Sequence, residues 1–262
     1  MSSGWFGEKK TQFSLWVSLN NDLYLRHHDV ILPSKNGSAQ IDHLVISPFG
    51  IFIVETKNLK GWIYGDATQS SWTQVIYRSK HKFQNPLRQT FRQKKVIAEF
   101  LGVREKHIHP LVAFVGKCKL KTDMPPNVIS SGFGSYIKSF QQKVFTDEEV
   151  QRIQHLISNH VATSLVSTDD HIQSLRDRHS STTICPRCGS NLVERTVKNG
   201  ANAGSQFLGC EDYPRCRFTR DLPPVESGVR NGSSVGGFIL KIILVFSGIA
   251  AIYLFFWTMT QR

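Results

Sequence analysis

The sequence predicts an α/β protein with two smaller appendages, and three observations support this prediction. Residues 5–161 alternate between strand-like and helix-like hydrophobic patterns, which is typical of an α/β domain. A short block at residues 185–222 contains four of the five cysteines, which favours a metal site over a disulfide framework. The chain ends in a long apolar run, in which residues 242–261 carry no charge.

The elements of the large domain follow from local patterns. Pro86 marks the start of a helix, where its missing N–H costs nothing. Thr146 and Glu149 have the spacing of a capping box at the start of another. Leu87, Phe91, Val96, Ile97 and Phe100 are expected on the buried face of the first of these helices. The expected order is a helix over 7–20, strands over 24–33, 40–47 and 50–58, a helix over 86–101, a strand over 110–116 and a helix over 146–161.

The remaining segments differ in composition. Residues 162–184 are rich in Ser and Thr and weakly patterned, so they are predicted to be a linker. The cysteine block occupies 185–222, a flexible Pro/Gly/Ser spacer 223–235, and a transmembrane helix 236–259. The N-terminus has no apolar core of a signal peptide.

Within residues 39–65, Asp42, Glu55 and Lys57 interrupt the two apolar strands of a hairpin. If Ser47–Gly50 is a tight turn, Asp42 lies opposite Glu55, and Lys57 shares the face of Glu55. Two opposed carboxylates repel unless a cation lies between them, and hard oxygen ligands of this kind suit Mg²⁺. Such a metal activates water, and the lysine stabilises developing charge or positions the attacking water. An ion pair at the end of the sheet is the alternative explanation for the same charges.

The hairpin resembles a known family. The sequence QIDHLVISPFGIFIVETKN, together with GEKK at 7–10 and NPLRQ at 85–89, is similar to the nuclease-related (NERD) domain of the PD-(D/E)XK nuclease superfamily. The resemblance covers roughly residues 5–115. It implies a central mixed sheet flanked by helices, with Asp42 and Glu55 as magnesium ligands and Lys57 as the catalytic lysine. It also places Glu8 in the catalytic site, although Glu8 equally fits a partner for the helix dipole.

The charge of the chain favours an anionic partner. The formal net charge is +12, which suits nucleic acid or an acidic membrane surface, or serves solubility alone. Residues 78–106 contain nine Lys or Arg against two acids, a pattern typical of phosphate contacts or of a solvated helix face. The candidate nucleic-acid contacts in this segment are Arg88, Gln89, Arg92, Lys94 and Lys95.

The cysteine block has the spacing of a structural zinc site. Two residues lie between Cys185 and Cys188, five lie between Cys210 and Cys216, and 21 residues separate the two pairs. Two such pairs form a closed Cys₄ site on which folding depends. The block resembles the C4 zinc finger of bacterial type I topoisomerases, which implies binding of DNA, chiefly single-stranded. The candidate contacts are the aromatic residues Phe207, Tyr213 and Phe218, which could equally fill the small core, and the cations Arg215, Arg217 and Arg220.

The apolar tail has the length and flanks of a membrane anchor. About 20 apolar residues match the hydrocarbon thickness, Lys241 can reach the headgroups, and Trp257 suits the far interface. A buried core helix is the alternative. Arg230 and Lys241 precede the span and only Arg262 follows it, so both soluble modules are expected in the cytoplasm, at a bacterial inner membrane.

Two functional hypotheses follow. The first is a membrane-anchored, Mg²⁺-dependent deoxyribonuclease with a zinc-finger DNA-binding module. The second is a catalytically inactive membrane protein that binds or tethers DNA. The complete set of Asp42, Glu55 and Lys57 favours the enzyme, because an inactive protein has no need of it.

Overall fold

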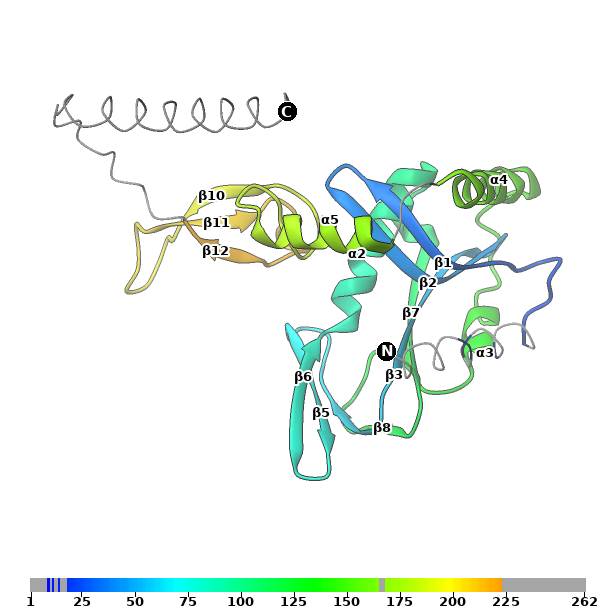
Figure 1. The fold of residues 1–262 in the computed structure, drawn as a ribbon, viewed down its shortest axis with the longest axis horizontal. Coiled ribbons are helices and arrows are strands. Elements are labelled where there is room, and N and C mark those ends of the chain that lie inside the picture. The colour runs from blue at the N-terminus through cyan, green and yellow to red at the C-terminus, as the bar shows by residue number, and fades with distance from the viewer. Residues whose placement is uncertain (1–8, 10, 12–13, 15–17, 165–167, 223–262) are drawn as a thin grey trace, which may run out of the picture. The chain divides into compact units, whose positions relative to one another are not determined.

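The computed structural model describes residues 9, 11, 14, 18–164 and 168–222. They form a mixed α/β structure with three sheets (Figure 1). The first sheet has the order β1-β2-β3-β7-β9; β1, β2 and β3 are antiparallel neighbours, whereas β7 is parallel to both β3 and β9. Its strands are β1 (Leu25–Ser34), β2 (Gly37–Ser47), β3 (Gly50–Asn58), β7 (Ile108–Val115) and β9 (Val128–Ile129).

Helices cover both faces of this sheet. One face packs against α2 (Pro86–Leu101) and α4 (Asp147–Thr163), through Ile41, Ile53, Ile97 and Ile153. The other face packs against α3 (Phe133–Lys138), through Phe52, Val54 and Ile137 among others. Burial on both faces explains why β3 and β7 are almost continuously apolar until Glu55 and Lys57 appear at the end of β3.

A second sheet is absent from the sequence-based prediction. It has the order β6-β5-β4-β8 and packs Trp72 in a stacked contact with Phe114 of β7, with ring centroids 6.0 Å apart. Its strands have three to six residues, and β6 is largely polar, so their hydrophobic pattern is weak. They are β4 (Gly61–Tyr64), β5 (Ser71–Ile76), β6 (Ser79–Gln84) and β8 (Cys118–Leu120); a 3₁₀ turn, η1, covers Glu105–His107.

The segment predicted as a linker contains a helix, α5 (Thr168–Ser180), and α4 continues to Thr163. Polar contacts hold this helix in place, so its sequence lacks the hydrophobic periodicity that would have predicted a helix. Ser38 Oγ of β2 lies 2.7 Å from His171 Nδ1 and 2.9 Å from Ser174 Oγ. The cysteine block follows as a three-stranded antiparallel sheet of β10 (Leu192–Thr196), β11 (Gln206–Cys210) and β12 (Thr219–Asp221).

Both predicted helix starts are confirmed. Asn85 caps α2 by accepting from the Leu87 N–H, with Pro86 in the first turn, and Thr146 and Glu149 form the capping box of α4. The predicted buried face of α2 is only partly correct. Val96 and Ile97 are buried, but so are the polar Arg92 and Gln93. The reason is that α2 also contacts Glu55 of the hairpin and the cysteine block at 185–222.

Several predictions concern residues outside the described part. Residues 9, 11, 14 and 18 are helical, within the helix predicted over 7–20, but Glu8 lies outside the described residues. The spacer at 223–235 and the membrane span at 236–259 also lie outside them. Among the described residues, no helix combines the length and the apolar character needed to cross a bilayer.

Candidate active site and zinc module

The hairpin has the predicted register. Ser47 pairs with Gly50 and His43 with Val54, so Asp42 and Glu55 are the next positions outward. The ladder of paired residues ends at His43, and there the Asp42 carboxylate accepts a hydrogen bond from the Thr56 backbone N–H, at 2.8 Å. The Asp42 side chain thus holds the two strands together at the point where the backbone pairing stops.

Glu55 and Lys57 form the centre of the site. The Glu55 side chain is only 2% exposed, and its Oε1 lies 2.5 Å from Lys57 Nζ. The ammonium also donates to Gln89 Oε1 of α2, at 3.1 Å. The structure therefore brings the predicted Glu55, Lys57 and Gln89 together, and the sheet and α2 hold the lysine from two sides.

Gln93 is a site residue that the sequence analysis missed. It is buried, and its Nε2 donates to Glu55 Oε2 at 2.9 Å and to the Gln40 carbonyl at 2.8 Å. Its spacing of four residues from Gln89 puts both amides on one face of α2, and this spacing is the signal that could have revealed it. Gln93 Oε1 is buried and has no hydrogen-bond partner among the described residues.

The basic residues predicted on α2 have different surroundings. Arg92 is buried, and its Nη2 donates to the carbonyls of Asn36 and Ser38. Burial and the nearby Arg178 lower the pKa of Arg92 to about 10. Arg88 donates to the Thr68 carbonyl, and Lys94 is half-buried. The contacts of Arg92 and Arg88 are thus with the protein's own backbone.

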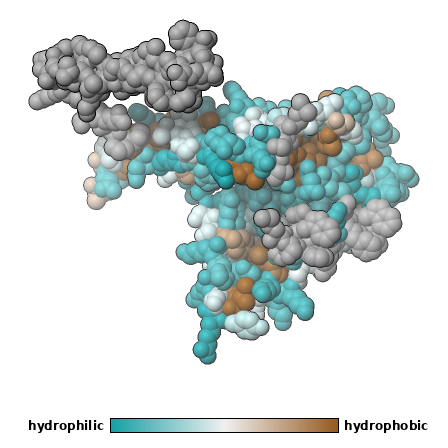
Figure 2. Space-filling view, viewed as in Figure 1, coloured by the Kyte–Doolittle hydropathy of each residue, from teal (hydrophilic) through white to brown (hydrophobic). Residues whose placement is uncertain are grey.

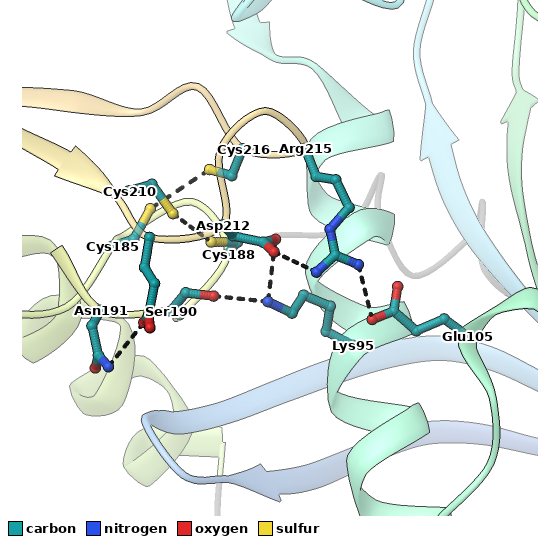
Figure 3. Close-up of polar contacts among 12 residues, drawn as sticks. Lys95, Glu105, Cys185, Cys188, Ser190, Asn191, Cys210, Asp212, Arg215 and Cys216 are labelled. Carbon is teal, nitrogen blue, oxygen red and sulfur yellow. Dashed lines mark hydrogen bonds and ion pairs between the residues drawn. The ribbon is translucent and has the colours of Figure 1, made fainter. Parts of the chain in front are cut away.

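The cysteine block at 185–222, which we call the zinc module, contacts α2 and the 3₁₀ turn through a short polar network (Figure 3). Lys95 Nζ lies 2.7 Å from Ser190 Oγ and 3.3 Å from a carboxylate oxygen of Asp212. Arg215 lies 2.5 Å from the other Asp212 oxygen and 3.6 Å from Glu105. Lys95 and Arg215, both predicted DNA contacts, thus connect the zinc module to α2 and the 3₁₀ turn.

The four cysteines of the module form one buried cluster. Their sulfur atoms lie within 4.8 Å of one another, with 3.8 Å between Cys185 and Cys216 and 3.3 Å between Cys188 and Cys210. None of the four forms a disulfide. Tetrahedral coordination with Zn–S bonds of about 2.3 Å separates sulfurs by about 3.8 Å, so the donor set and spacing fit a structural Zn²⁺.

The thiols also have the electrostatics of a metal site. Hydrogen bonds from the Cys185 and Cys216 thiols lower the pKa of Cys188. The same contact with Cys188 raises the pKa of Cys185 to about 12, and burial raises that of Cys210 to about 12. One thiolate is thus stabilised at the expense of its neighbours, and all four ionise together only beside a cation.

The predicted aromatic residues of the module line a common hollow of about 610 Å³. Phe207, Tyr213 and Phe218 lie there with the predicted Arg217, and Tyr213 is 60% exposed. Arg195 and Lys198, which the sequence analysis did not single out, also line the hollow, and the Arg195 guanidinium lies 5.8 Å from the Tyr213 ring centroid. Arg220, by contrast, donates to the carbonyls of Ser181 and His179.

Comparisons with known protein families agree with this architecture. The model of the nuclease-related domain matches residues 3–115, and that of the topoisomerase DNA-binding C4 zinc finger matches residues 182–225. A Bacillus anthracis protein, pXO1-01, is 36% identical over 159 residues, which cover 58% of this chain and 73% of the relative. The chain therefore belongs to the nuclease-related domain family and carries a topoisomerase-type C4 zinc finger.

Two further relatives match shorter stretches of the chain. DNA topoisomerase 1 of Archaeoglobus fulgidus is 51% identical over 39 residues, which are 15% of this chain and 5% of that enzyme. The YrdD protein of Escherichia coli is 39% identical over 59 residues, 22% of this chain and 25% of the relative. No solved structure matches the chain.

Proposed function

We propose that this protein is a membrane-anchored, metal-dependent DNA nuclease of the PD-(D/E)XK type, which hydrolyses phosphodiester bonds. The observation that carries the proposal is the placement of Lys57. Its ammonium is held by Glu55 and Gln89 at the end of β3, and the Asp42 carboxylate accepts from the backbone N–H of the preceding residue, Thr56. A buried carboxylate and a partly exposed lysine at the open end of a sheet form a reactive group with a fixed position.

The residues present fit a magnesium ion. Asp42 and Glu55 offer hard carboxylate oxygens at neighbouring positions of one hairpin, which is the donor type that Mg²⁺ requires. The buried Gln93 Oε1, without a partner among the described residues, is an acceptor that a metal-bound water would satisfy. When bound, the ion supplies charge neutralisation at the scissile phosphate and an acidified water. Glu8 is proposed as an additional carboxylate of this site.

The protein's own residues perform the positioning steps. Lys57 can donate a hydrogen bond to the attacking water or to a phosphate oxygen as negative charge develops there. Hydrogen bonds to Gln89 and Glu55 hold the Lys57 ammonium in place. Gln93 donates to the other oxygen of the Glu55 carboxylate and fixes its orientation. This arrangement stabilises the charge that develops as the water oxygen bonds to phosphorus and the bond to the leaving oxygen breaks.

DNA is the proposed substrate. The hollow of the zinc module combines the exposed Tyr213 ring and two partly buried phenylalanine rings with cations, which suits stacked bases next to phosphates. The similarity to the topoisomerase DNA-binding zinc finger and to the DNA topoisomerase 1 of Archaeoglobus supports DNA as well. The proposed contacts are Gln89, Arg88, Arg92, Lys94 and Lys95 on α2, and Phe207, Tyr213, Arg215, Arg217 and Phe218 in the zinc module.

We further propose that residues 236–259 anchor the protein in a bacterial inner membrane, with the soluble modules in the cytoplasm. The support is the sequence itself: an uncharged run at 242–261, preceded by Arg230 and Lys241. The glycine- and serine-rich spacer before it would let the zinc module move relative to the membrane surface.

The short Glu55–Lys57 contact also favours a second candidate function. An ion pair that satisfies both charges is stable without a metal or a substrate, as expected for an inactive DNA-binding or DNA-tethering protein. The two functions differ in one measurement. Full-length protein in mild detergent is incubated with labelled single- and double-stranded DNA, with Mg²⁺ or with EDTA. Cleavage with Mg²⁺ and not with EDTA is expected, and intact DNA in both conditions would favour the inactive protein.

A further inference from the structure

A cleft of about 680 Å³ leads to the candidate active site. One side is formed by β2 and α2, and the other by α5 and the first cysteine turn of the zinc module, at Pro186 and Arg187. Its lining includes Asp42, Gln89 and Gln93, which contact the hairpin strands, Lys57 and Glu55 respectively. We call this feature the α2–α5 cleft. A molecule bound in it reaches the proposed catalytic groups.

The α2–α5 cleft is strongly cationic. Its lining contains Arg92, Arg176, Arg178 and Arg187 and a single carboxylate, that of Asp42. Among the described residues, none of these arginines has a carboxylate within 4.0 Å. The thiolates around the zinc site lie close to Arg92 and Arg178 and offset part of their charge. Arg176 and Arg187 add two further positive charges, so an anionic ligand is favoured.

Arg178 is the most informative of the four. Its side chain is buried, only 5% exposed, and its Nε and Nη1 have no hydrogen-bond partner within the described part of the chain. Burying a guanidinium without partners is costly, and α5 places this one in the wall of the cleft. A phosphate oxygen in the cleft would supply the negative charge that Arg178 lacks, and it would accept from Nη2, which is not among the buried atoms of this guanidinium.

The cleft also contains apolar groups that a phosphate alone would not use. Ile172 is 39% exposed, and Leu175 and Pro186 lie beside it in the lining, with the exposed His179 imidazole. Figure 2 shows a small hydrophobic area surrounded by hydrophilic atoms over α5. Unpaired bases present flat faces to such groups, whereas the bases of a duplex are stacked on one another.

Arg187 connects this cleft to the hollow of the zinc module. It lines the α2–α5 cleft, and its guanidinium lies 5.9 Å from the ring centroid of Phe218, which lines the hollow. A strand stacked on Phe218 therefore has its next phosphates within reach of Arg187 and then of α5.

We propose that the α2–α5 cleft binds single-stranded nucleic acid, with phosphates on Arg176, Arg178 and Arg187 and bases against Ile172 and Leu175. The linker helix α5 is then part of the substrate-binding surface, and it guides the strand from the zinc module to Lys57. The inference rests on the proposed nuclease function for its biological meaning, but the binding itself is independent of cleavage.

The test measures binding in EDTA, where no metal-dependent cleavage interferes. Full-length protein in mild detergent is titrated against a fluorescent single-stranded oligonucleotide and against the corresponding duplex. The variant is Arg176→Glu/Arg187→Glu, which changes two partly or fully exposed residues and leaves the buried Arg178 in place. Arg78→Glu/Arg104→Glu is the matched control, because it makes the same charge change at exposed arginines outside the cleft.

The cleft variant should bind the single strand at least about tenfold more weakly than the control. Its plot of log affinity against log salt concentration should be shallower by about 1.4, the value for two lost single-strand phosphate contacts. A photoreactive amino acid at position 172 should cross-link to the strand, and the same group at the exposed Val161 of α4 should not.

Equal single-strand affinities of cleft variant and control, or an equal loss for the single strand and the duplex, would overturn the assignment. A protein that cleaves no DNA but shows the cleft-specific loss of binding would contradict the nuclease proposal and leave this one standing.

Discussion

The two sites of this protein hold their chemical groups in different ways. Asp42, Glu55 and Lys57 lie at the end of a sheet that has large hydrophobic cores on both faces, and protein groups satisfy their charges. The zinc module has a small core made mostly of the four cysteines, with Leu192 and Leu208. The first site is positioned by packing, whereas the second brings four buried thiols together for an ion.

This difference shows where a metal contributes to folding and where it contributes to chemistry. A chain segment of about 40 residues rarely buries enough apolar surface to fold without a staple, so zinc is part of its fold. The hairpin site needs no ion for its structure, so a metal there would act on the substrate. The following predictions test this contrast in order of decreasing effect.

Removal of zinc should unfold residues 185–222 and leave the α/β part folded. Without the ion, neighbouring thiolates repel and the small core has too little apolar area. Hydrogen exchange measured by mass spectrometry, with zinc content from elemental analysis, should show lost protection in β10–β12 and retained protection in β1–β3. A reduced, zinc-free module with unchanged protection would contradict the assignment.

Deletion of residues from 234 onward should release the protein from the membrane without loss of DNA binding. This third region carries the proposed anchor and none of the residues of the two sites. Fractionation shows the release, and protease added to intact and opened cells shows the orientation. Full-length protein in the soluble fraction, or a soluble domain cleaved from outside intact cells, would refute the membrane assignment.

Gln93→Ala should reduce cleavage by about tenfold and destabilise the protein by about 1–3 kcal/mol. The substitution leaves the buried Glu55 Oε2 without the donor at 2.9 Å, and a buried unsatisfied carboxylate oxygen is costly. Gln84→Ala, at an exposed position in the α2–α5 cleft, is the control. Denaturant unfolding and initial rates measure both effects; a Gln93→Ala protein equal to the control would show that Gln93 does not position Glu55.

Acid should destabilise the α/β part by a few degrees of melting temperature between about pH 6.5 and pH 4. Burial lowers the pKa of His43 to about 3 and that of His109 to about 4, from an ordinary value of 6.5. The unfolded chain therefore binds protons first, and stability is lost as the pH falls through this window. His43→Gln should flatten the dependence, whereas His155→Gln, at an exposed position of α4, should not. Equal slopes of melting temperature against pH for the unchanged protein and both variants would show that His43 does not cause the loss of stability.

The sequence predicted the features that depend on short-range chemistry. The turn from Ser47 to Gly50 determined the hairpin register, the caps marked the starts of α2 and α4, and the cysteine spacing indicated the zinc cluster. It did not predict α5, whose contacts with Ser38 are polar and span more than 130 residues. The inward orientation of Arg92 and Gln93 likewise depends on the zinc module and the hairpin, which are distant along the chain.

The central proposal is that Glu55 and Lys57 perform catalysis. The most direct measurement compares Glu55→Ala and Lys57→Ala with the unchanged protein, for Mg²⁺-dependent cleavage of labelled DNA and for DNA affinity in EDTA. We expect cleavage to fall by at least about a hundredfold in both variants, with DNA affinity and the fold retained. The melting temperature should fall in Lys57→Ala, because the buried Glu55 carboxylate loses its ion-pair partner. Unchanged cleavage in clean preparations of both variants would show that these residues are not catalytic.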